Sequence, residues 1–390
     1  AAVAAGHDGS ILSYERMVAA PAQPMDLRWE LPRESETIIY TSGSSREPKG
    51  VMLKGSALYF ASFRQSGALE ARCDDVFITP ITFAHVFGIG AGLLIPLLVG
   101  ARIVLCDRYQ PERVLGLIAS ERVSVHFGVP TMFIREMKDD SFGREDMSSL
   151  RTGIVAGSLC PTGLIGEFEQ KTGCRLLCAY GLTETSATLT TTRLDDDDYT
   201  RSSTVGRPVE GVEVALLDTR EDAGYDRPVG EVICRTPGVM EGYYKDDDLS
   251  AKAFTPDGWF RTGDLGSLGA DGTLRIVGRC KNTINRGGFN IYPEEIEAFY
   301  RNNENLLDVC LLEYPDSELG ERTSLFVQLA PGAYASGEEL RVWSAEGLEK
   351  FKIPDRIVFV ESMPRLGSGK VDRQLLRKIL AELKLPGAVC

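Results

Sequence analysis

The sequence lacks the signals of several common enzyme classes. It contains neither a GxGxxG nor a GxSxG pattern, so dinucleotide-dependent oxidoreductases and serine hydrolases are without their usual motifs. Its three histidines, His7, His85 and His126, are too far apart for a sequence-local zinc motif. The nine cysteines show no CxxC spacing, which supports neither a disulfide framework nor a zinc site. We therefore expect a reducing, cytoplasmic location.

Long hydrophobic runs and an excess of positive charge are also absent. The apolar run Gly92–Val99 is far shorter than the roughly 20 residues that cross a bilayer, and we expect it in the buried core. The N-terminal stretch AAVAAGHDGS does not resemble a secretory signal. The formal net charge of −13, from 56 acidic and 43 basic residues, opposes broad binding to nucleic acid or anionic lipid. We expect no membrane span and no nucleic-acid partner.

The length and composition predict a globular protein with more than one folded unit. A chain of 390 residues exceeds the roughly 250 to 300 at which single cores stop growing. Strand-like and helix-like stretches alternate between about residues 36 and 190, which predicts an α/β layer with a largely parallel sheet. These stretches include the strand-like Thr37–Tyr40, Ala101–Cys106 and Arg151–Ala156 and the helix-like Pro111–Glu121.

The pattern changes twice towards the C-terminus. Between Gly206 and Gly278, short β runs punctuated by Gly, Pro and Asp predict a more antiparallel subdomain. The polar segment Gly278–Asn285 lacks strong periodicity, and we place a domain boundary there, dividing the chain into residues 1–280 and 281–390. The second part mixes the predicted helix Pro293–Asn302 with strands near Val309 and Leu325, which indicates a small α+β domain.

The loop Thr41–Gly50 (TSGSSREPKG) has a composition suited to a polyphosphate. It supplies hydroxyls, backbone amides and one cation, from Thr41, Ser42, Gly43, Ser44, Ser45 and Lys49. The loop fails the GxxxxGK[ST] pattern because Lys49 is followed by Gly50, so the usual P-loop mechanism is not inferred. The alternative is a purely structural polar turn.

Three further positions carry carboxylates or a cation in loops. Glu184 follows Thr183 just beyond the apolar run Arg175–Ala179, where ligands bind in open α/β sheets, and its carboxylate suits magnesium. Asp264 lies in a Gly-bearing turn, and its carboxylate could accept hydrogen bonds from two ribose hydroxyls. Lys370 lies on a two-glycine loop, and its charge could neutralise a transferring phosphoryl group. The alternatives are a capping Thr/Glu pair, a turn residue and a solvated surface lysine.

A fourth acidic feature is the run Asp195–Asp198. It lies between apolar segments, and no metal-ligand spacing accompanies it. We interpret it as a solvated loop, with a metal site as the alternative.

Together and in this order, these stretches resemble the adenylate-forming superfamily of acyl- and aryl-CoA ligases, luciferases and peptide-synthetase adenylation domains. The resemblance spans about residues 37 to 380. It rests on YTSGSSREPKG, AYGLTETSA, GEVICRTPGVMEGYY, GWFRTGDLG, GRCKNTINRGGFNIYPEEIE and PRLGSGKVDRQLLR. It implies a large N-terminal adenylation domain over residues 1–280, N-terminally short, and a mobile C-terminal domain over residues 281–390.

The resemblance also assigns roles. Thr41 to Lys49 would embrace the ATP phosphates, and Thr183 with Glu184 would bind phosphate and Mg²⁺. Asp264, aided by Arg279, would hold the ribose. The adenine would be bordered by Gly157, Ser158, Tyr180 and Gly181. Lys370 would act between the carboxylate and the α-phosphate, then leave as the C-terminal domain turns about a hinge near Lys281 and Asn282, after which Gly287 and Gly288 would line the pantetheine tunnel.

The segment Phe83–Phe87 (FAHVF) narrows the expected substrate. Relatives that activate α-amino acids carry an aspartate where this sequence has Ala84, so an α-ammonium group would lack its counter-ion. A simple aryl or acyl acid fits better. The candidate pocket residues are Phe83, His85, Phe87 and Phe127, with plain core packing as the alternative for the aromatic ones. His85 also joins Lys370, Glu184 and Thr183 as a candidate catalytic residue.

The implied activity is ATP-dependent conversion of a carboxylic acid to an acyl-adenylate, followed by transfer to the thiol of CoA. Loading of a carrier-protein phosphopantetheine is the nearest alternative. A catalytically weak acyl or nucleotide sensor and a luciferase-like oxidation are the others. The expected partners are a small carboxylic acid and CoA or a carrier protein. The short N-terminus belongs either to a naturally short form or to a fragment, and an oligomer is allowed because a fragment would expose apolar surface for a partner to cover.

Overall fold

The computed structural model describes residues 3–5, 11–13, 37–41, 48–222, 224–365 and 371–383. The chain forms two compact units, Ala1–Arg33 and Glu34–Cys390. In the first unit, β1 (Val3–Ala5) and β2 (Ile11–Ser13) pair in antiparallel fashion. All the elements that follow belong to the second unit.

A seven-stranded sheet forms the predicted α/β layer. Its strand order is β11-β10-β9-β8-β7-β5-β6, and the five strands from β5 to β9 run parallel. The chain leaves β5 towards β6 on one side and returns to β7 on the other, so the strand order reverses at β5. The strands are β5 (Val76–Thr79), β6 (Arg102–Leu105), β7 (Val125–Gly128), β8 (Thr152–Val155), β9 (Arg175–Tyr180), β10 (Thr190–Thr191) and β11 (Arg207–Pro208).

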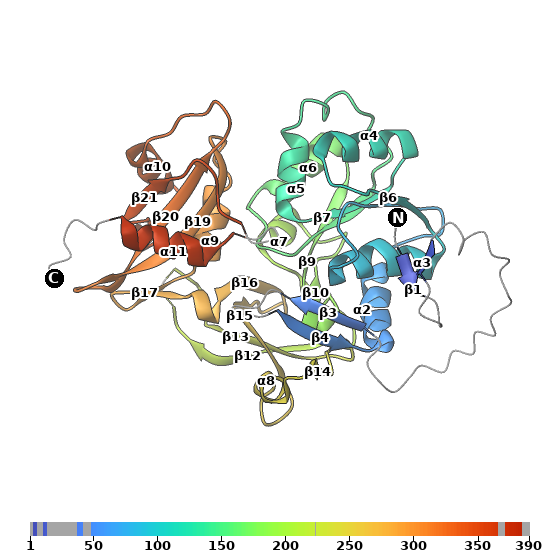
Figure 1. Ribbon diagram of the computed structural model, residues 1–390, viewed down its shortest axis with the longest axis horizontal. Helices are drawn as coiled ribbons and strands as arrows, with labels where there is room; N and C mark the ends of the chain where they lie inside the picture. The colour runs from blue at the N-terminus through green and yellow to red at the C-terminus, as the bar shows by residue number, and fades with distance from the viewer. Residues whose placement is uncertain are drawn as a thin grey trace. The chain divides into compact units, whose positions relative to one another are not determined.

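Three helices grouped beside β7 in Figure 1 pack against this sheet. They are α4 (Pro111–Glu121), α5 (Pro130–Met137) and α6 (Leu164–Thr172). Helices α4 and α5 begin with proline, whose missing N–H would have no partner in the first turn. The rings of Phe133 and Phe168 meet edge to face at 5.0 Å in the core between the helices. The predicted helix Pro111–Glu121 is confirmed at both ends.

The strand predicted at Thr37–Tyr40 forms, but outside the parallel layer. Strand β3 (Thr37–Thr41) pairs antiparallel with β4 (Lys49–Leu53), and β14 (Gly242–Tyr243) pairs with the other edge of β4. The connection between β3 and β4 is too short for a parallel crossover, which needs about a dozen residues or more. Thr41 lies opposite Lys49 in the register, so the two ends of the TSGSSREPKG loop are side by side.

The expectation that Gly92–Val99 is buried is wrong for part of the run. It lies in the π-helix η1 (Gly88–Leu94) and in α3 (Ile95–Val99), and α2 (Gly55–Ala68) packs beside both. Ile95 is buried, whereas Leu97 is 61% exposed. A helix turns successive side chains to different sides, so an uninterrupted apolar run cannot bury all of them against one neighbour. None of the described helices combines the length and the hydropathy of a membrane span.

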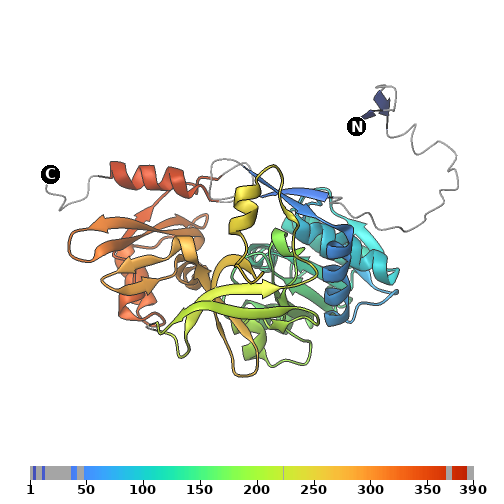
Figure 2. The ribbon, with the colours of Figure 1, turned by 90° about the horizontal axis from the view of Figure 1, so that it is seen from below.

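A four-stranded antiparallel sheet confirms the predicted β-rich subdomain. Its order is β12-β13-β15-β16, drawn in yellow-green to gold in Figure 2. The strands are β12 (Glu213–Arg220), β13 (Val229–Arg235), β15 (Phe260–Leu268) and β16 (Leu274–Arg279). Helix α8 (Asp247–Lys252) lies between β14 and β15 in the chain, and the Asp246 side chain caps it by accepting from the Leu249 N–H at 3.0 Å.

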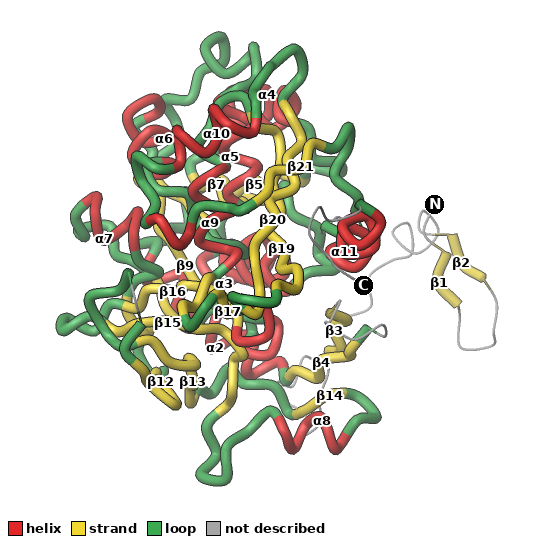
Figure 3. The backbone as a smooth tube through the Cα atoms, turned by 90° about the vertical axis from the view of Figure 1, so that its left-hand side faces the viewer, coloured by secondary structure: helices red, strands yellow, loops and turns green. Residues whose placement is uncertain are grey.

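The C-terminal region has a sheet of its own. Strands β18, β17, β20 and β19 follow one another in antiparallel pairs, and β21 adds to β20 in parallel. Helix α11 packs over β19 and β20 through Leu376 and Leu380 (Figure 3). The strands are β17 (Ile284–Arg286), β18 (Phe289–Ile291), β19 (Leu306–Asp316), β20 (Gly320–Leu329) and β21 (Arg356–Phe359), and the helices are α9 (Pro293–Tyr300), α10 (Gly337–Ser344) and α11 (Arg373–Glu382). The predicted boundary between residues 280 and 281 stays a prediction.

A contact joins the β12–β13 connection to the C-terminal region, and we call it the inter-sheet contact. The Tyr225 hydroxyl donates to Glu295 at 2.5 Å, and the Lys352 ammonium lies 4.7 Å from the centre of the Tyr225 ring. The Asp222 carboxylate accepts a hydrogen bond from the Tyr292 hydroxyl. Burial, and then the charge of Glu295, raises the pKa of Tyr225, so this hydroxyl stays protonated and donates.

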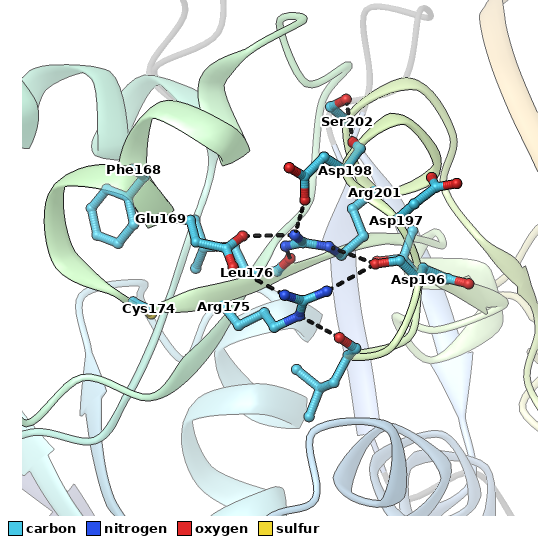
Figure 4. A network of polar contacts seen from close by, with 12 residues as sticks. Phe168, Glu169, Cys174, Arg175, Leu176, Asp196, Asp197, Asp198, Arg201 and Ser202 are labelled. Carbon is cyan, nitrogen blue, oxygen red and sulfur yellow. Dashed lines mark hydrogen bonds and ion pairs between the residues drawn. The ribbon is translucent and has the colours of Figure 1, made fainter.

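A buried arginine, Arg201, organises the acidic run Asp195–Asp198 (Figure 4). Its guanidinium pairs with Glu169 on α6 at 2.7 Å and with Asp198 at 2.6 Å, and it donates to the Leu176 carbonyl of β9 at 3.4 Å. We call this group the Arg201 network. It ties α6 and α7 (Asp198–Ser203) to β9 and favours the loop interpretation of the acidic run.

No group of three or more His, Cys, Asp or Glu side chains in the described ranges is placed to hold a metal ion.

Candidate active site

A cavity of about 280 Å³ opens at the carboxyl ends of β8 and β9. Ala156 and Gly157 line it just after β8, and Gly181 and Glu184 line it just after β9. Ligands of open α/β sheets bind outside the carboxyl ends of the strands, and the sheet also reverses its order nearby, at β5. The fold thus brings the segment containing Tyr180 to Glu184 to the place that the sequence predicted for it.

The ends of the TSGSSREPKG loop also reach this cavity. Thr41 and Lys49, which face each other across β3 and β4, both line it. The Lys49 ammonium lies 5.4 Å from the centre of the Tyr243 ring, which fixes this cation beside the cavity. Five predicted site residues lie outside the described residues: Ser42, Gly43, Ser44, Ser45 and Lys370.

Thr183 and Glu184 lie in a single helical turn, η2 (Thr183–Thr185), and both line the cavity. One carboxylate oxygen of Glu184 accepts a hydrogen bond from the Tyr243 hydroxyl at 2.9 Å. Burial, and then the Glu184 charge, raises the pKa of Tyr243, so the hydroxyl remains a donor. A single held carboxylate fits Mg²⁺, which commonly takes one or two protein carboxylates and completes its shell with phosphate oxygens and water.

The turn that presents these residues is tightly folded. Ser186 and Ala187, which also line the cavity, have φ values of +56° and +84°, a backbone region that residues other than glycine rarely adopt. Gly181 lies against this turn, and a Cβ atom there would be 2.0 Å from the Ala187 carbonyl oxygen. Only glycine allows this close approach, which sets the path of the chain from β9 into η2.

Asp264 is buried beside the cavity, with 5% of its surface exposed. It lies opposite Arg279 on the neighbouring strand, and the Arg279 Nε is 3.0 Å from its carboxylate. The Tyr180 hydroxyl donates to its other oxygen at 2.8 Å. Burial raises the pKa of Asp264, and the charge of Arg279 and the hydrogen bond from Tyr180 oppose this rise. Arg279 lines the cavity, whereas Asp264 and Tyr180 stand behind its lining.

Apolar side chains form one wall of the cavity. We call this the apolar wall, made of Phe87, Ala91, Ile95 and Ile154. Phe127 packs behind Phe87, with ring centres 5.4 Å apart, and is itself fully buried. Its position agrees with the alternative of plain core packing.

The remaining candidates of the Phe83–Phe87 segment divide between the cavity and the surface. His85 lines the cavity, and its Nδ1 accepts from the Phe87 backbone N–H at 3.1 Å. Phe83 is 40% exposed, and neither it nor Ala84 is among the described residues that line the cavity. The segment therefore contributes His85, Val86 and Phe87 to the site.

Besides Phe83, Tyr180 and Asp264, three further predicted site residues do not line this cavity. Ser158 lines a second depression, of about 470 Å³, together with Arg301 and Arg365. Gly287 and Gly288 form the two-residue turn between β17 and β18, with φ values of +60° and +90°. Such a turn needs positive φ at both positions, so the hairpin explains both glycines structurally.

Several lining residues were not predicted from the sequence. Polar examples are Ser62 and Gln65 on α2, Thr188 and Thr262, and Lys281, predicted only as a hinge residue, lines the cavity as well. Ser62 and Gln65 are three residues apart on the helical face that also buries Leu58 and Ala61. Polar residues among the apolar residues of a buried helical face are the sequence signal that could have identified them.

Comparison with known proteins identifies the family. The model of the AMP-binding enzyme family matches residues 7–244, and that of the AMP-binding enzyme C-terminal domain matches residues 295–370. The chain belongs to the AMP-binding, adenylate-forming enzymes. The predicted superfamily and fold class are confirmed.

The relatives include CoA ligases for different acids. The chain is 33% identical to the medium-chain fatty-acid–CoA ligase of Escherichia coli, over 88% of this chain and 61% of the ligase. It is 35% identical to the 2-hydroxy-7-methoxy-5-methyl-1-naphthoate–CoA ligase of Streptomyces carzinostaticus, over 89% of this chain and 63% of the ligase. ATP-bound MatB from Rhodopseudomonas palustris has a TM-score of 0.82 at 27% identity, over 97% of this chain and 74% of that chain. The chain thus spans less than two thirds of the length of these two ligases.

Proposed function

We propose that this protein activates a carboxylic acid with ATP, forming an acyl-adenylate and pyrophosphate, and passes the acyl group to the thiol of CoA. The observation that carries this proposal is that charged and polar groups and an apolar wall line one and the same cavity. Hydroxyls and charged groups of Thr41, Lys49, Glu184 and Arg279 line it together with the apolar wall. A nucleotide phosphate group and the apolar body of an acid would be held next to each other by such a lining.

The chemistry requires little of the protein beyond position and charge. A carboxylate oxygen attacks the α-phosphorus, and the bond to the β-phosphate oxygen breaks as pyrophosphate leaves. The CoA sulfur then attacks the acyl carbon, and AMP leaves with the bonding electrons. Lys49 and Arg279 line the cavity and would supply positive charge to the phosphates, where negative charge accumulates. Mg²⁺ bound at Glu184 would supply further charge neutralisation.

The ribose would be held by Asp264. One of its carboxylate oxygens accepts a hydrogen bond from the Tyr180 hydroxyl, and the other forms an ion pair with Arg279. A carboxylate oxygen accepts two hydrogen bonds, so each oxygen keeps an acceptor site for one ribose hydroxyl. Of the four residues predicted to border the adenine, Gly157 and Gly181 line the same cavity, whereas Ser158 and Tyr180 do not.

Lys370 provides the sharpest test of the proposed order of steps. We predict that Lys370→Ala slows acid-dependent pyrophosphate release severely and leaves thioester formation from supplied acyl-adenylate near the wild-type rate. Lys378→Ala, which removes a lysine of α11 instead, is the matched control and should change neither rate. Equal losses in both half-reactions for Lys370→Ala would refute the assignment.

The acceptor is tested by the same assay. Wild-type protein should release pyrophosphate with an acid alone and form a thioester when CoA is added. Acylation of a phosphopantetheine carrier protein in place of CoA would favour the carrier alternative, and no pyrophosphate release with any acid would favour a sensor. A cytoplasmic location, and a partner or oligomer, stay predictions, tested by cell fractionation and by light scattering.

A further inference from the structure

Two buried oxygen atoms of the cavity lining have no hydrogen-bond partner. They are the Ser62 Oγ and the Gln65 Oε1, and each residue is only 3% exposed. Among the described residues that line the cavity, these are the buried side-chain polar atoms left unpaired. A buried oxygen without a partner lowers stability, so such atoms call for an explanation.

The geometry of α2 shows that Ser62 is a special case on its helix. The hydroxyl of Ser66, one turn further on, donates to the Phe63 carbonyl at 2.8 Å, as helical serines commonly do. Ser62 makes no such bond and instead lines the cavity. Gly90 lies opposite, where a Cβ atom would be 3.7 Å from the Ser62 hydroxyl oxygen. The absence of a side chain at Gly90 leaves this hydroxyl facing cavity space.

The hydrogen bonds of Gln65 determine which end of its amide is left over. Its Nε2 donates to the Thr191 hydroxyl at 3.5 Å. Thr191 in turn donates its hydroxyl proton to the Thr192 carbonyl, so it serves Gln65 as an acceptor. The amide nitrogen therefore faces Thr191, and the amide oxygen remains as an acceptor that needs a donor from elsewhere.

We propose that Ser62 and Gln65 select a carboxylic acid that carries a hydroxyl group on its apolar body. A hydroxyl donates to the Gln65 oxygen and accepts from the Ser62 hydroxyl, so one group satisfies both atoms. A plain alkyl or aryl end leaves both oxygens unpaired and desolvated. An ammonium group would need an anionic partner, and both side chains are neutral. This inference rests on the proposed function, because it names the substrate class of the same cavity.

Matched pairs of acids test the inference by direct binding. The probes are benzoate with its ortho-, meta- and para-hydroxy derivatives, phenylpropanoate with its para-hydroxy derivative, and octanoate with its terminal hydroxy derivative. Calorimetry on the full chain should show at least one hydroxy acid binding about tenfold or more tightly than its parent. Equal affinities in every pair, or no binding of any acid, overturn the inference.

Three variants separate ligand recognition from structural roles. In the double variant Ser62→Ala/Gln65→Met, the preference for the hydroxy acid should fall to about one. Ser66→Ala, on the same helix but bonded to its own backbone, should keep the full preference. Gln65→Met should melt at the wild-type temperature or above it, because an unpaired buried oxygen is removed. A preference that survives in the double variant overturns the inference.

A turnover assay keeps the two proposals apart. Hydroxy-acid preference in binding without pyrophosphate release would refute the proposed function and leave the inference standing. Pyrophosphate release without any hydroxy preference would refute the inference and leave the proposed function standing.

Discussion

The ion pair between Asp264 and Arg279 gives the most quantitative test of the proposed nucleotide site. Asp264→Asn keeps the shape of the side chain and removes its charge. The asparagine oxygen can accept one ribose hydroxyl, but its NH₂ group donates and so cannot accept the second. Loss of one hydrogen bond to a charged acceptor costs about 1.5 to 3 kcal/mol. AMP should therefore bind about 10- to 150-fold more weakly.

Calorimetric titration with AMP measures this change, and two variants control it. Tyr180→Phe removes one hydrogen bond to the carboxylate and keeps its charge, so a smaller loss, of about 2- to 10-fold, is expected. Asp257→Asn changes an exposed carboxylate of a nearby turn and should leave AMP binding unchanged. Arg279 is 47% exposed, so it stays hydrated when its partner is neutralised, and the Asp264→Asn fold should survive.

The pH dependence supplies an independent check. The ionised carboxylate is the better acceptor, so wild-type affinity for AMP should fall on acidification through the pKa of Asp264. Burial raises that pKa above its ordinary value of 3.8, so the fall should begin at a higher pH than for an exposed aspartate. Asp264→Asn should lack the Asp264 contribution to this fall and keep only the part that comes from protonation of AMP itself. Wild-type affinity for AMP in the variant, or the same acid-side fall in both proteins, would refute the assigned role.

Two further changes test how the fold supports the site. Arg201→Met should lower the free energy of unfolding by about 1 to 3 kcal/mol in a denaturant titration, because Glu169 and Asp198 lose a fully buried partner, while Glu169 keeps its ion pair with Arg175. Arg207→Met, which removes a side chain that is 24% exposed, should cost less. Equal losses would contradict the importance of burial. Gly181→Ala should abolish pyrophosphate release and lower the melting temperature, because its Cβ would overlap the Ala187 carbonyl. The control is Gly166→Ala in α6, where a Cβ meets nothing within 4 Å, so this variant should be neutral or stabilising by up to about 1 kcal/mol. A fully active Gly181→Ala protein would show that the turn relaxes.

The sequence predicted those parts of the fold that local patterns determine. Helix α4 begins at Pro111 and ends at Glu121, as predicted. The change from parallel to antiparallel sheets was also visible in the turn residues. Strand β3 was assigned to the parallel layer because the residues of a strand do not determine which strand it pairs with. The short connection to β4 determines the partner and makes the pair antiparallel.

The site was predicted where a motif carries its chemistry and missed where only packing does. Thr183, Glu184 and Arg279 belong to recognisable sequence motifs and meet in one cavity. Ser62 and Gln65 belong to no motif, and their significance depends on Gly90 and Thr191, which come from other elements. Leu97 illustrates the same limit, since its exposure follows from where α3 packs and not from its own hydrophobicity.

The inter-sheet contact has a consequence for the proposed rotation about Lys281 and Asn282. A turn of the C-terminal region would separate Tyr225 from Glu295 and from Lys352. If that contact contributes about 1.5 to 3 kcal/mol, it restricts the rotated arrangement to a population about 10- to 150-fold smaller than it would otherwise have. Binding of CoA would have to supply at least this bias. The Tyr225 contact would then delay the second half-reaction until CoA has bound.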